Sequence, residues 1–113
     1  MILLDYLKNK NYQLIQSRSD YGYNEVYVFL KDDIFYILTK EKNIVFLELQ
    51  YCKSEEKVSI GYLVDSNNFL TEEEIIQLLE TTNFSFLKKM TDEQIIDLKK
   101  KMVNSRLKKP ILK

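Results

Sequence analysis

Residues 25–64 carry four short runs rich in β-branched and aromatic side chains, and only a few polar residues separate one run from the next. The first two runs flank Asp32-Asp33 in EVYVFLKDDIFYILTK, and the last two are joined through SEEK. Connections this short reverse the chain, whereas a parallel pair of strands needs a crossover of about a dozen residues or more. The sequence therefore predicts consecutive β-hairpins in an antiparallel meander.

Helix patterns precede and follow these strands. Residues 2–8 carry apolar side chains at helical spacing, and YQLIQSR at residues 12–18 adds one more strand. Two further helices are expected at about Glu72 to Thr82 and about Asp92 to Leu107, with a proline shortly after the second. The strands are thus expected to lie between one N-terminal and two C-terminal helices.

These elements predict an α+β fold: an antiparallel sheet of about five strands with an N-terminal helix and two C-terminal helices, in two layers. With 113 residues the chain is long enough for one domain with its own core. We expect residues 1–113 to form that single domain, with a short basic tail at residues 108–113.

Two segments read almost alike: LTEEEIIQLLE, which begins at Leu70, and MTDEQIIDLKK, which begins at Met90. In each segment a threonine is followed three residues later by Glu or Gln, and an apolar residue precedes the threonine. This is the pattern of a capping box with a hydrophobic staple, which starts a helix. Two helix starts explain the similarity without any shared function.

The second of these helices differs from the first in the middle of its apolar face. Lys99 stands where Leu79 stands in the first helix, and Arg106 follows seven residues later on the same side. Long cationic side chains can lie along a core while their charges reach water. The alternative is that the two cations face an acid, either in this chain or in a partner. In that case Lys99 and Arg106 are candidate partner-binding residues.

Alternation along the second hairpin indicates which side of the sheet is buried. Apolar side chains gather on one face, and small or polar ones gather on the other. The predicted core face holds Val45, Leu47, Leu49, Tyr51, Val58, Ile60, Tyr62 and Val64, and the predicted solvent face holds Glu48, Gln50, Ser59 and Gly61.

The first hairpin is apolar on both faces. Either the N-terminal helix helps to cover this end of the sheet on both sides, or an apolar and aromatic patch is exposed. In the second case, Tyr27 and Phe29 are candidate partner-binding residues. The alternating sets are Val26, Val28 and Leu30 against Tyr27 and Phe29, and Ile34, Tyr36 and Leu38 against Phe35 and Ile37.

The polar segment DYGYN contains Tyr21 and Tyr23 on either side of a glycine, and its composition predicts a loop. Mixtures of Tyr, Gly, Asn, Ser and Asp are frequent in adaptable binding surfaces. The two rings can instead fold back over the edge of the sheet. We take Tyr21 and Tyr23 as candidate partner-binding residues, at least half exposed.

The residues that most catalytic and cofactor sites need are missing. The chain has no histidine, so the usual general base and the Ser/His and Cys/His arrangements are excluded. Cys52 is the single cysteine, and two glycines cannot make a phosphate-binding loop. Asp32-Asp33 is a turn sequence rather than a metal site. We therefore predict a protein that is not an enzyme, with no catalytic residue, metal or cofactor.

Composition points to the source and compartment. The chain lacks alanine and tryptophan, and 15 of its 17 basic residues are lysine, as expected from an AT-rich bacterial, phage or mobile-element genome. The N-terminus does not read as a signal peptide, and no apolar stretch reaches the roughly 20 residues of a membrane span. A lone cysteine suits a reducing compartment. We expect a cytoplasmic protein.

Charge is distributed unevenly. Residues 1–87 hold 8 basic and 14 acidic side chains, a net charge of −6, whereas residues 88–113 hold 9 basic and 3 acidic, a net charge of +6. The basic end could contact phosphate, but it has no aromatic residue to stack on bases. A nucleic-acid-binding accessory protein that uses the basic C-terminal helix and tail is therefore the second expectation.

The first expectation is a small protein-binding module. A short, single-domain, cytoplasmic chain without catalytic motifs is typical of immunity proteins and of phage-encoded inhibitors of host defence. Its partner would be another protein, such as a toxin, a nuclease or a defence enzyme, bound in a stoichiometric complex.

Overall fold

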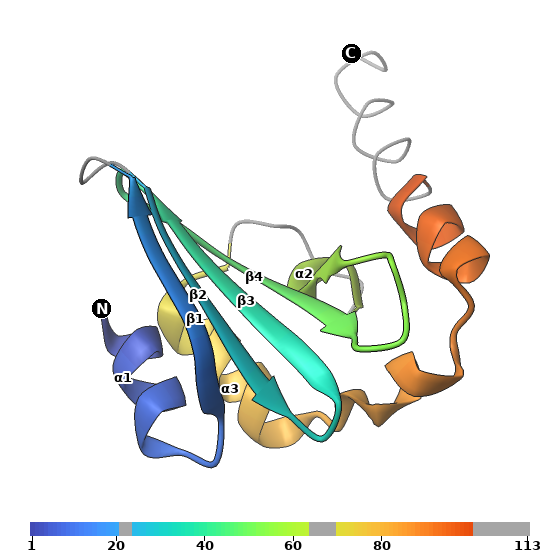
Figure 1. Cartoon of the computed structure of the whole chain (residues 1–113), viewed down its shortest axis with the longest axis horizontal. Helices are drawn as coiled ribbons and strands as arrows, with labels where there is room; N and C mark the ends of the chain where they lie inside the picture. Colours follow the sequence, from blue (N-terminus) through green and yellow to red (C-terminus); the bar gives the residue numbers. More distant parts are fainter. Residues whose placement is uncertain (21–23, 64–69, 101–113) are drawn as a thin grey trace.

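The computed structural model describes residues 1–20, 24–63 and 70–100 (Figure 1). It confirms the α+β fold, in which an N-terminal helix, an antiparallel five-stranded sheet and C-terminal helices follow one another along the chain. The labelled elements are α1 (Ile2–Asn9), β1 (Gln13–Asp20), β2 (Asn24–Lys31), β3 (Ile34–Glu41), β4 (Ile44–Tyr51), β5 (Val58–Ser59), α2 (Ile60–Leu63), α3 (Glu72–Thr81) and the 3-10 helix η1 (Phe84–Lys89). Residues 92–100 are also helical, so the predicted last helix is seen as far as residue 100, and its continuation lies outside the described residues.

The five strands lie side by side in chain order, β1-β2-β3-β4-β5, and every neighbouring pair is antiparallel. Two-residue turns join β2 to β3 and β3 to β4. Asp32 and Asp33 have φ of 52° and 67°, and Lys42 has φ of 54°. Positive φ at both central positions is the mark of a type I′ turn, whose twist matches that of the strands, and Asp tolerates it. The predicted hairpin at Asp32-Asp33 is therefore confirmed.

The predicted last strand, residues 57–64, needs correction. Only Val58 and Ser59 pair with β4, and the chain then turns into the short helix α2. A glycine weakens a strand, and the chain leaves the sheet just before Gly61. Ile60 and Gly61 are both buried, so Gly61 does not lie on a solvent face, while residue 64 lies outside the described residues.

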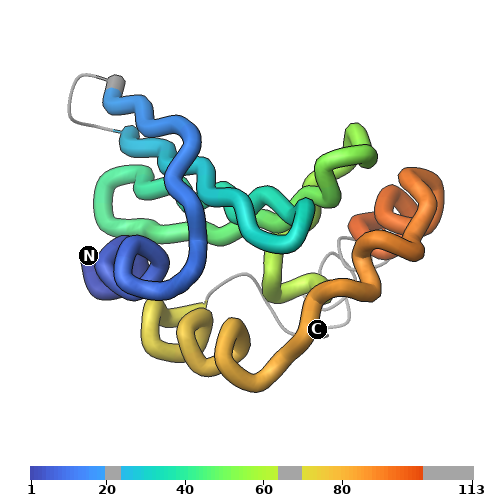
Figure 2. The backbone as a smooth tube through the Cα atoms, turned by 60° about the horizontal axis from the view of Figure 1, so that its bottom comes forward, coloured from blue at the N-terminus to red at the C-terminus, as the bar shows by residue number. Residues whose placement is uncertain are grey.

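One face of the sheet meets the helices. Leu47 and Leu49 of β4 are 1 % and 0 % exposed, which confirms the predicted core face of this strand. Figure 2 shows α1 and α3 on one side of the strands. The core joins sheet residues Phe29, Ile34, Tyr36, Leu38, Leu47, Leu49 and Val58 to Leu3, Leu7, Ile60, Ile75, Phe84, Leu87 and Ile95 from the helices, with Tyr12 between α1 and β1.

Both predicted capping boxes are present. The Thr71 hydroxyl accepts from the Glu74 amide at 3.1 Å, and Glu74 Oε1 accepts from the Thr71 amide at 2.9 Å. The equivalent bonds between Thr91 and Gln94 are 3.1 and 2.8 Å. The same local chemistry thus starts both helices.

A backbone amide in the first turn of α1 has its acceptor on a residue that is distant in the sequence. Met1 offers no side-chain cap, and the amide of Leu3 donates instead to Oε1 of Glu72 at 3.0 Å. The first amides of a helix have no partner within the helix, so this bond both caps α1 and ties it to the first turn of α3.

Replacing either capping threonine should destabilise the fold. We expect Thr71→Ala and Thr91→Ala each to lower the free energy of unfolding by about 1 kcal/mol, because each leaves a helix amide without its acceptor. Denaturant unfolding measures the loss, and the matched Thr→Ser variants, which keep the hydroxyl, should lose much less. Equal stability of the alanine and serine variants would contradict the capping role.

Two buried tyrosines lie where α1, β1 and β3 meet. The rings of Tyr12 and Tyr36 are 8 % and 7 % exposed and stand edge to face with centroids 4.9 Å apart. The ammonium of Lys31 lies 4.5 Å from the centroid of the Tyr12 ring. Burial, with a smaller contribution from the charge of Asp32, raises the pKa of Tyr36 to about 12. Burial raises the pKa of Tyr12 as well.

These shifts predict a loss of stability in alkali. An unfolded tyrosine ionises near pH 10, whereas folded Tyr36 stays protonated up to a pH of about 12. The unfolded state therefore holds fewer protons in this window, and the free energy of unfolding falls by up to about 1.4 kcal/mol per pH unit for each such tyrosine. Below pH 10 the contribution is fully present.

Urea unfolding of Tyr36→Phe and Tyr12→Phe between pH 9 and pH 12 tests this, because phenylalanine cannot ionise. Each variant should show a shallower decline than the parent protein, and the double variant the shallowest. Declines that run parallel to the parent's would rule out these two tyrosines as the cause.

Candidate interaction surface

The second face of the sheet is apolar and is not covered by the described helices. We call it the open face. Its side chains are partly exposed, and none of them belongs to the core or packs against it. The sequence left open whether both faces of the first hairpin are covered. In the described part of the chain, the helices cover only one of them. The apolar residues of the open face are Val26, Val28 and Leu30 from β2, Phe35 and Ile37 from β3, and Phe46 from β4.

Strand register places these side chains in rows that cross the sheet. Val28 pairs with Ile37, and Ile37 pairs with Glu48. The neighbouring row joins Leu30 to Phe35. Directly opposite residues in an antiparallel pair lie on the same face about 5 Å apart, so the apolar side chains of β2 and β3 are contiguous.

A shallow hollow lies on the β4 side of this patch. Its volume is about 280 Å³, and Phe46 contributes an apolar wall. Glu41 and Glu48 line it as well, so the hollow combines an aromatic ring with carboxylates. The remaining lining residues are Thr39 and Ser59.

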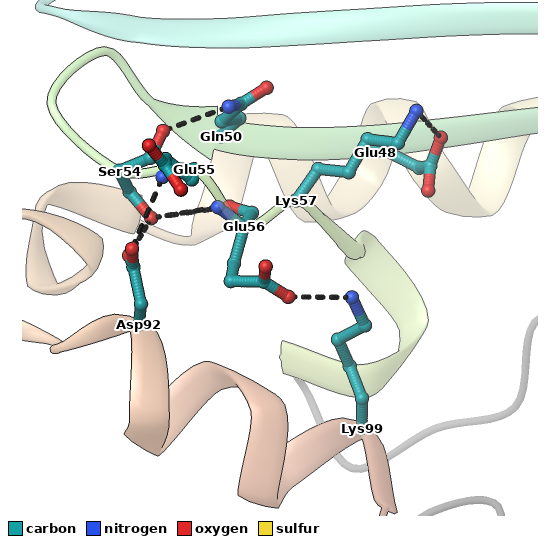
Figure 3. A network of polar contacts seen from close by, with 8 residues as sticks. All are labelled: Glu48, Gln50, Ser54, Glu55, Glu56, Lys57, Asp92 and Lys99. Carbon is teal, nitrogen blue, oxygen red and sulfur yellow. Dashed lines mark hydrogen bonds and ion pairs between the residues drawn. The ribbon is translucent and has the colours of Figure 1, made fainter.

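A network of polar contacts links β4 and the loop that follows it to the helix at residues 92–100 (Figure 3). The side-chain amide of Gln50 donates to the carbonyl oxygen of Ser54 at 2.9 Å. The Ser54 hydroxyl donates to Oδ1 of Asp92, and the amide of Glu55 donates to Oδ2 of the same carboxylate at 3.4 Å. Ser54 is 9 % exposed. This network fixes the β4–β5 loop against the first turn of the helix at residues 92–100.

Two ion pairs flank the network. Lys57 Nζ lies 3.8 Å from Glu48 Oε1, on the open face, and Lys99 Nζ lies 3.3 Å from Glu56 Oε1. The second pair is partly exposed, with side-chain exposures of 38 % and 27 %. Partly exposed pairs are worth about 1 kcal/mol or less, so they orient the loop more than they stabilise the fold.

The predicted partner-binding residues fall in different places. Phe29 is fully buried in the core, so its ring offers no surface to a partner, which corrects that choice. Tyr27 lies on the helix side of the sheet, partly buried, and its hydroxyl donates to Glu25 Oε1 at 2.6 Å. Lys99 faces the chain's own Glu56. The structure does not bring these three together.

The other candidates, Tyr21, Tyr23 and Arg106, lie outside the described residues. The interface role of the loop tyrosines and of Arg106 remains a prediction. The basic tail at residues 108–113 also lies outside the described residues.

The described residues contain no group of three or more acidic or cysteine side chains that could hold a metal ion. Cys52 is exposed at the end of β4, and Asp32 and Asp33 form a turn. Burial raises the pKa of the Tyr36 hydroxyl to about 12, which makes it a weaker acid than usual.

Sequence reasoning found the doubly apolar hairpin but placed Phe29, which is buried in the core, among the partner-binding candidates. The signal that identifies the core side is the register set by the turns. Leu47 and Leu49 belong to the core face by simple alternation, and the β3–β4 turn places Tyr36 opposite Leu49. The β2–β3 turn then places Phe29 opposite Tyr36. Phe29 is thereby assigned to the core.

The polar network yields a direct test with a matched control. Asp92→Ala and Glu93→Ala each remove one acid from the same helical turn, but only Asp92 accepts bonds from the β4–β5 loop. We expect Asp92→Ala to lower the free energy of unfolding by about 1–3 kcal/mol more than Glu93→Ala, because the Ser54 hydroxyl and Glu55 amide lose their acceptor. Equal losses in chemical denaturation would show that the network contributes nothing.

Comparison of the chain with protein-family models, with curated proteins and with solved structures finds no match. Among the described residues, no helix is long and apolar enough to cross a membrane. A function must therefore be inferred from the chemistry of the surfaces themselves.

Proposed function

We propose that this chain is a small, non-enzymatic protein-binding module that presents the open face of its sheet to another protein. The observation that carries the proposal is a strand pair with apolar side chains on both faces and described helices on only one. An antiparallel sheet usually turns a polar face to water. A contiguous apolar patch on a small protein is typical of an interaction site.

The charges beside the patch indicate the chemistry of the partner. Glu41 lies at the hollow beside Phe46, and residues 1–87 carry a net charge of −6. Glu48 at the same hollow is already paired with Lys57. Complementary potentials steer association and select partners. The partner surface would thus carry an apolar side chain flanked by Lys or Arg.

A basic partner fits the proposed biological setting. Nucleases and other enzymes that act on nucleic acids carry cationic surfaces. A protein that covers such a surface with its acidic side would act as a stoichiometric inhibitor, as an immunity or anti-defence protein does. We place this activity in the cytoplasm of a bacterium with an AT-rich genome, or in the infection cycle of its phage.

The nucleic-acid-binding alternative remains second. It relies on the basic C-terminal segment, and within the described part of that segment Lys99 is already paired with Glu56. The acidic character of residues 1–87 opposes binding to phosphate. No contact among the described residues adds support for it.

Site-specific photocrosslinking tests the proposal even while the partner is unidentified. A benzophenone amino acid replaces Phe35 on the open face, and in a control it replaces Phe86, which is 38 % exposed on η1. In cells that carry the natural gene, we expect one protein to be captured at Phe35 and not at Phe86. Capture of nothing at Phe35, or of the same proteins at both positions, would overturn the proposal.

The captured protein then allows an affinity test. Ile37→Glu should weaken its binding by about tenfold or more, because the interface would bury a carboxylate without a partner. Phe86→Glu is the matched control and should leave the dissociation constant unchanged. Both variants are first checked by thermal unfolding. Equal affinity of Ile37→Glu and the parent protein would exclude the open face from the interface.

A further inference from the structure

β1 forms one edge of the sheet, next to the open face. Every side chain from Gln13 to Ser19 is exposed, and β2 is its only strand neighbour in the described structure. An edge strand carries backbone N–H and C=O groups without strand partners, which another extended chain can use. The edge strands of natural proteins are often protected by charged side chains, Pro or β-bulges; β1 has Arg18 and an irregularity between Leu14 and Gln16, but no Lys and no Pro.

The turn geometry identifies which backbone groups of β1 are free. In a two-residue hairpin the residues flanking the turn exchange both hydrogen bonds, so Lys31 bonds to Ile34. Bonding directions alternate along an antiparallel strand. Leu30 and Val28 of β2 therefore point their backbone groups toward β1 rather than β3.

On β1, the residues opposite these positions use their backbone groups internally. Gln16 pairs with Val28, and Arg18 pairs with Val26. The residues between them point the other way. The N–H and C=O groups of Leu14, Ser17 and Ser19 therefore face away from the sheet and have no partner among the described strands.

An apolar contact lies at one end of this row. Leu14 and Ile15 are 42 % and 46 % exposed. The register shifts between Leu14 and Gln16, so Ile15 has no partner on β2. A β-bulge of this kind re-aims side chains at a sheet edge. The edge thus offers both a backbone ladder and an apolar anchor.

We propose that β1 accepts an extended segment of a partner protein as a sixth strand of the sheet. The inference rests on the proposed function, and it specifies how the partner binds. Backbone bonds at Leu14, Ser17 and Ser19 provide the ladder, and apolar side chains of the segment cover Leu14 and Ile15. Strand addition of this type combines main-chain affinity with side-chain specificity.

A second copy of the chain fits this edge less well. An antiparallel self-pairing centred on Ser17 sets Ile15 opposite Ser19, and one centred on Arg18 sets two guanidinium groups opposite each other, which is unfavourable. Pairing centred on Leu14 brings the apolar ends together, but it overlaps only residues 13–15, because β1 begins at Gln13. The occupant is therefore a segment of a different sequence.

The probe is a library of random peptides with the eight-residue length of β1, displayed on phage and selected on the immobilised full-length protein. The enriched peptides are synthesised, and their affinities are measured by calorimetry. We expect sequences without proline that carry apolar residues at one end. Failure to enrich any peptide would overturn the inference.

Proline variants locate the binding. Ser17→Pro and Ser19→Pro remove outward N–H groups that the β1–β2 ladder does not use, and edge strands tolerate such prolines. Each should weaken peptide binding by about tenfold or more. Glu73→Pro is the control, because the amide of this second residue of α3 has no acceptor within the helix, and Glu73 belongs to a different element from β1. Equal binding to all three variants would contradict strand addition at β1.

Amide hydrogen exchange on the unmodified protein keeps the test decisive if a proline variant fails to fold. In the free protein, the amides of Leu14, Ser17 and Ser19 should exchange faster than those of Gln16 and Arg18. Bound peptide should slow the first set and leave the second unchanged. No added protection in β1 would refute the inference.

The outcomes separate this inference from the proposed function. If the β1 prolines abolish peptide binding and no partner is crosslinked at Phe35, the proposed role of the open face is rejected, whereas strand addition at β1 is supported. If a partner is crosslinked at Phe35 and binds both proline variants as tightly as the parent protein, the role of the open face is supported and strand addition at β1 is rejected. If sedimentation shows that the parent protein is a dimer and that Ser17→Pro is not, the edge of β1 binds a second copy of the chain. This result would overturn the inference that β1 binds a segment of a different protein.

Discussion

The register of the sheet depends on two tight turns. Asp32 and Asp33 hold positive φ between β2 and β3, and Lys42 does so between β3 and β4. A two-residue turn leaves no freedom to slip, and a slip of one residue would exchange the two faces of a strand. These turns therefore decide that Tyr36, and with it Phe29, meets the helices while Phe35 and Ile37 do not.

The consequence is a sheet with more apolar side chains than its helices cover. α1 is tied to α3 through Glu72, and both lie on the core side, while the β4–β5 loop is tied through Ser54 and Asp92 to the helix at residues 92–100. None of these described elements reaches the apolar side chains of β2 and β3 on the open face. The edge of β1 is a second surface without a partner among the described strands, and its Leu14 lies on the helix side of the sheet, opposite Phe29.

The sequence predicted the capped helix starts and the turn at Asp32-Asp33, because their signals are local, whereas α2 and η1 were not predicted. Threonine caps and short polar turns act within a few residues, so the starts at Thr71 and Thr91 and the turn at Asp32 could be read directly. What depends on distant contacts was missed. The pattern around Gly61 fits a strand, but the pairing with β4 ends after Ser59 and the chain turns into α2. The assignment of the two faces of β2 to the core and to the open face required the register across three strands, which alternation within one strand cannot supply.

The central claim is that the open face is free in the isolated protein. Nuclear magnetic resonance with a soluble gadolinium chelate tests it most directly, because relaxation enhancement of methyl groups falls steeply with distance from solvent. The account predicts strong enhancement for the methyl groups of Val28 and Ile37, and little for those of Leu38 and Leu49, which are 0 % exposed. Enhancement of Ile37 as weak as that of Leu38 would show that this face is covered, and would contradict the account.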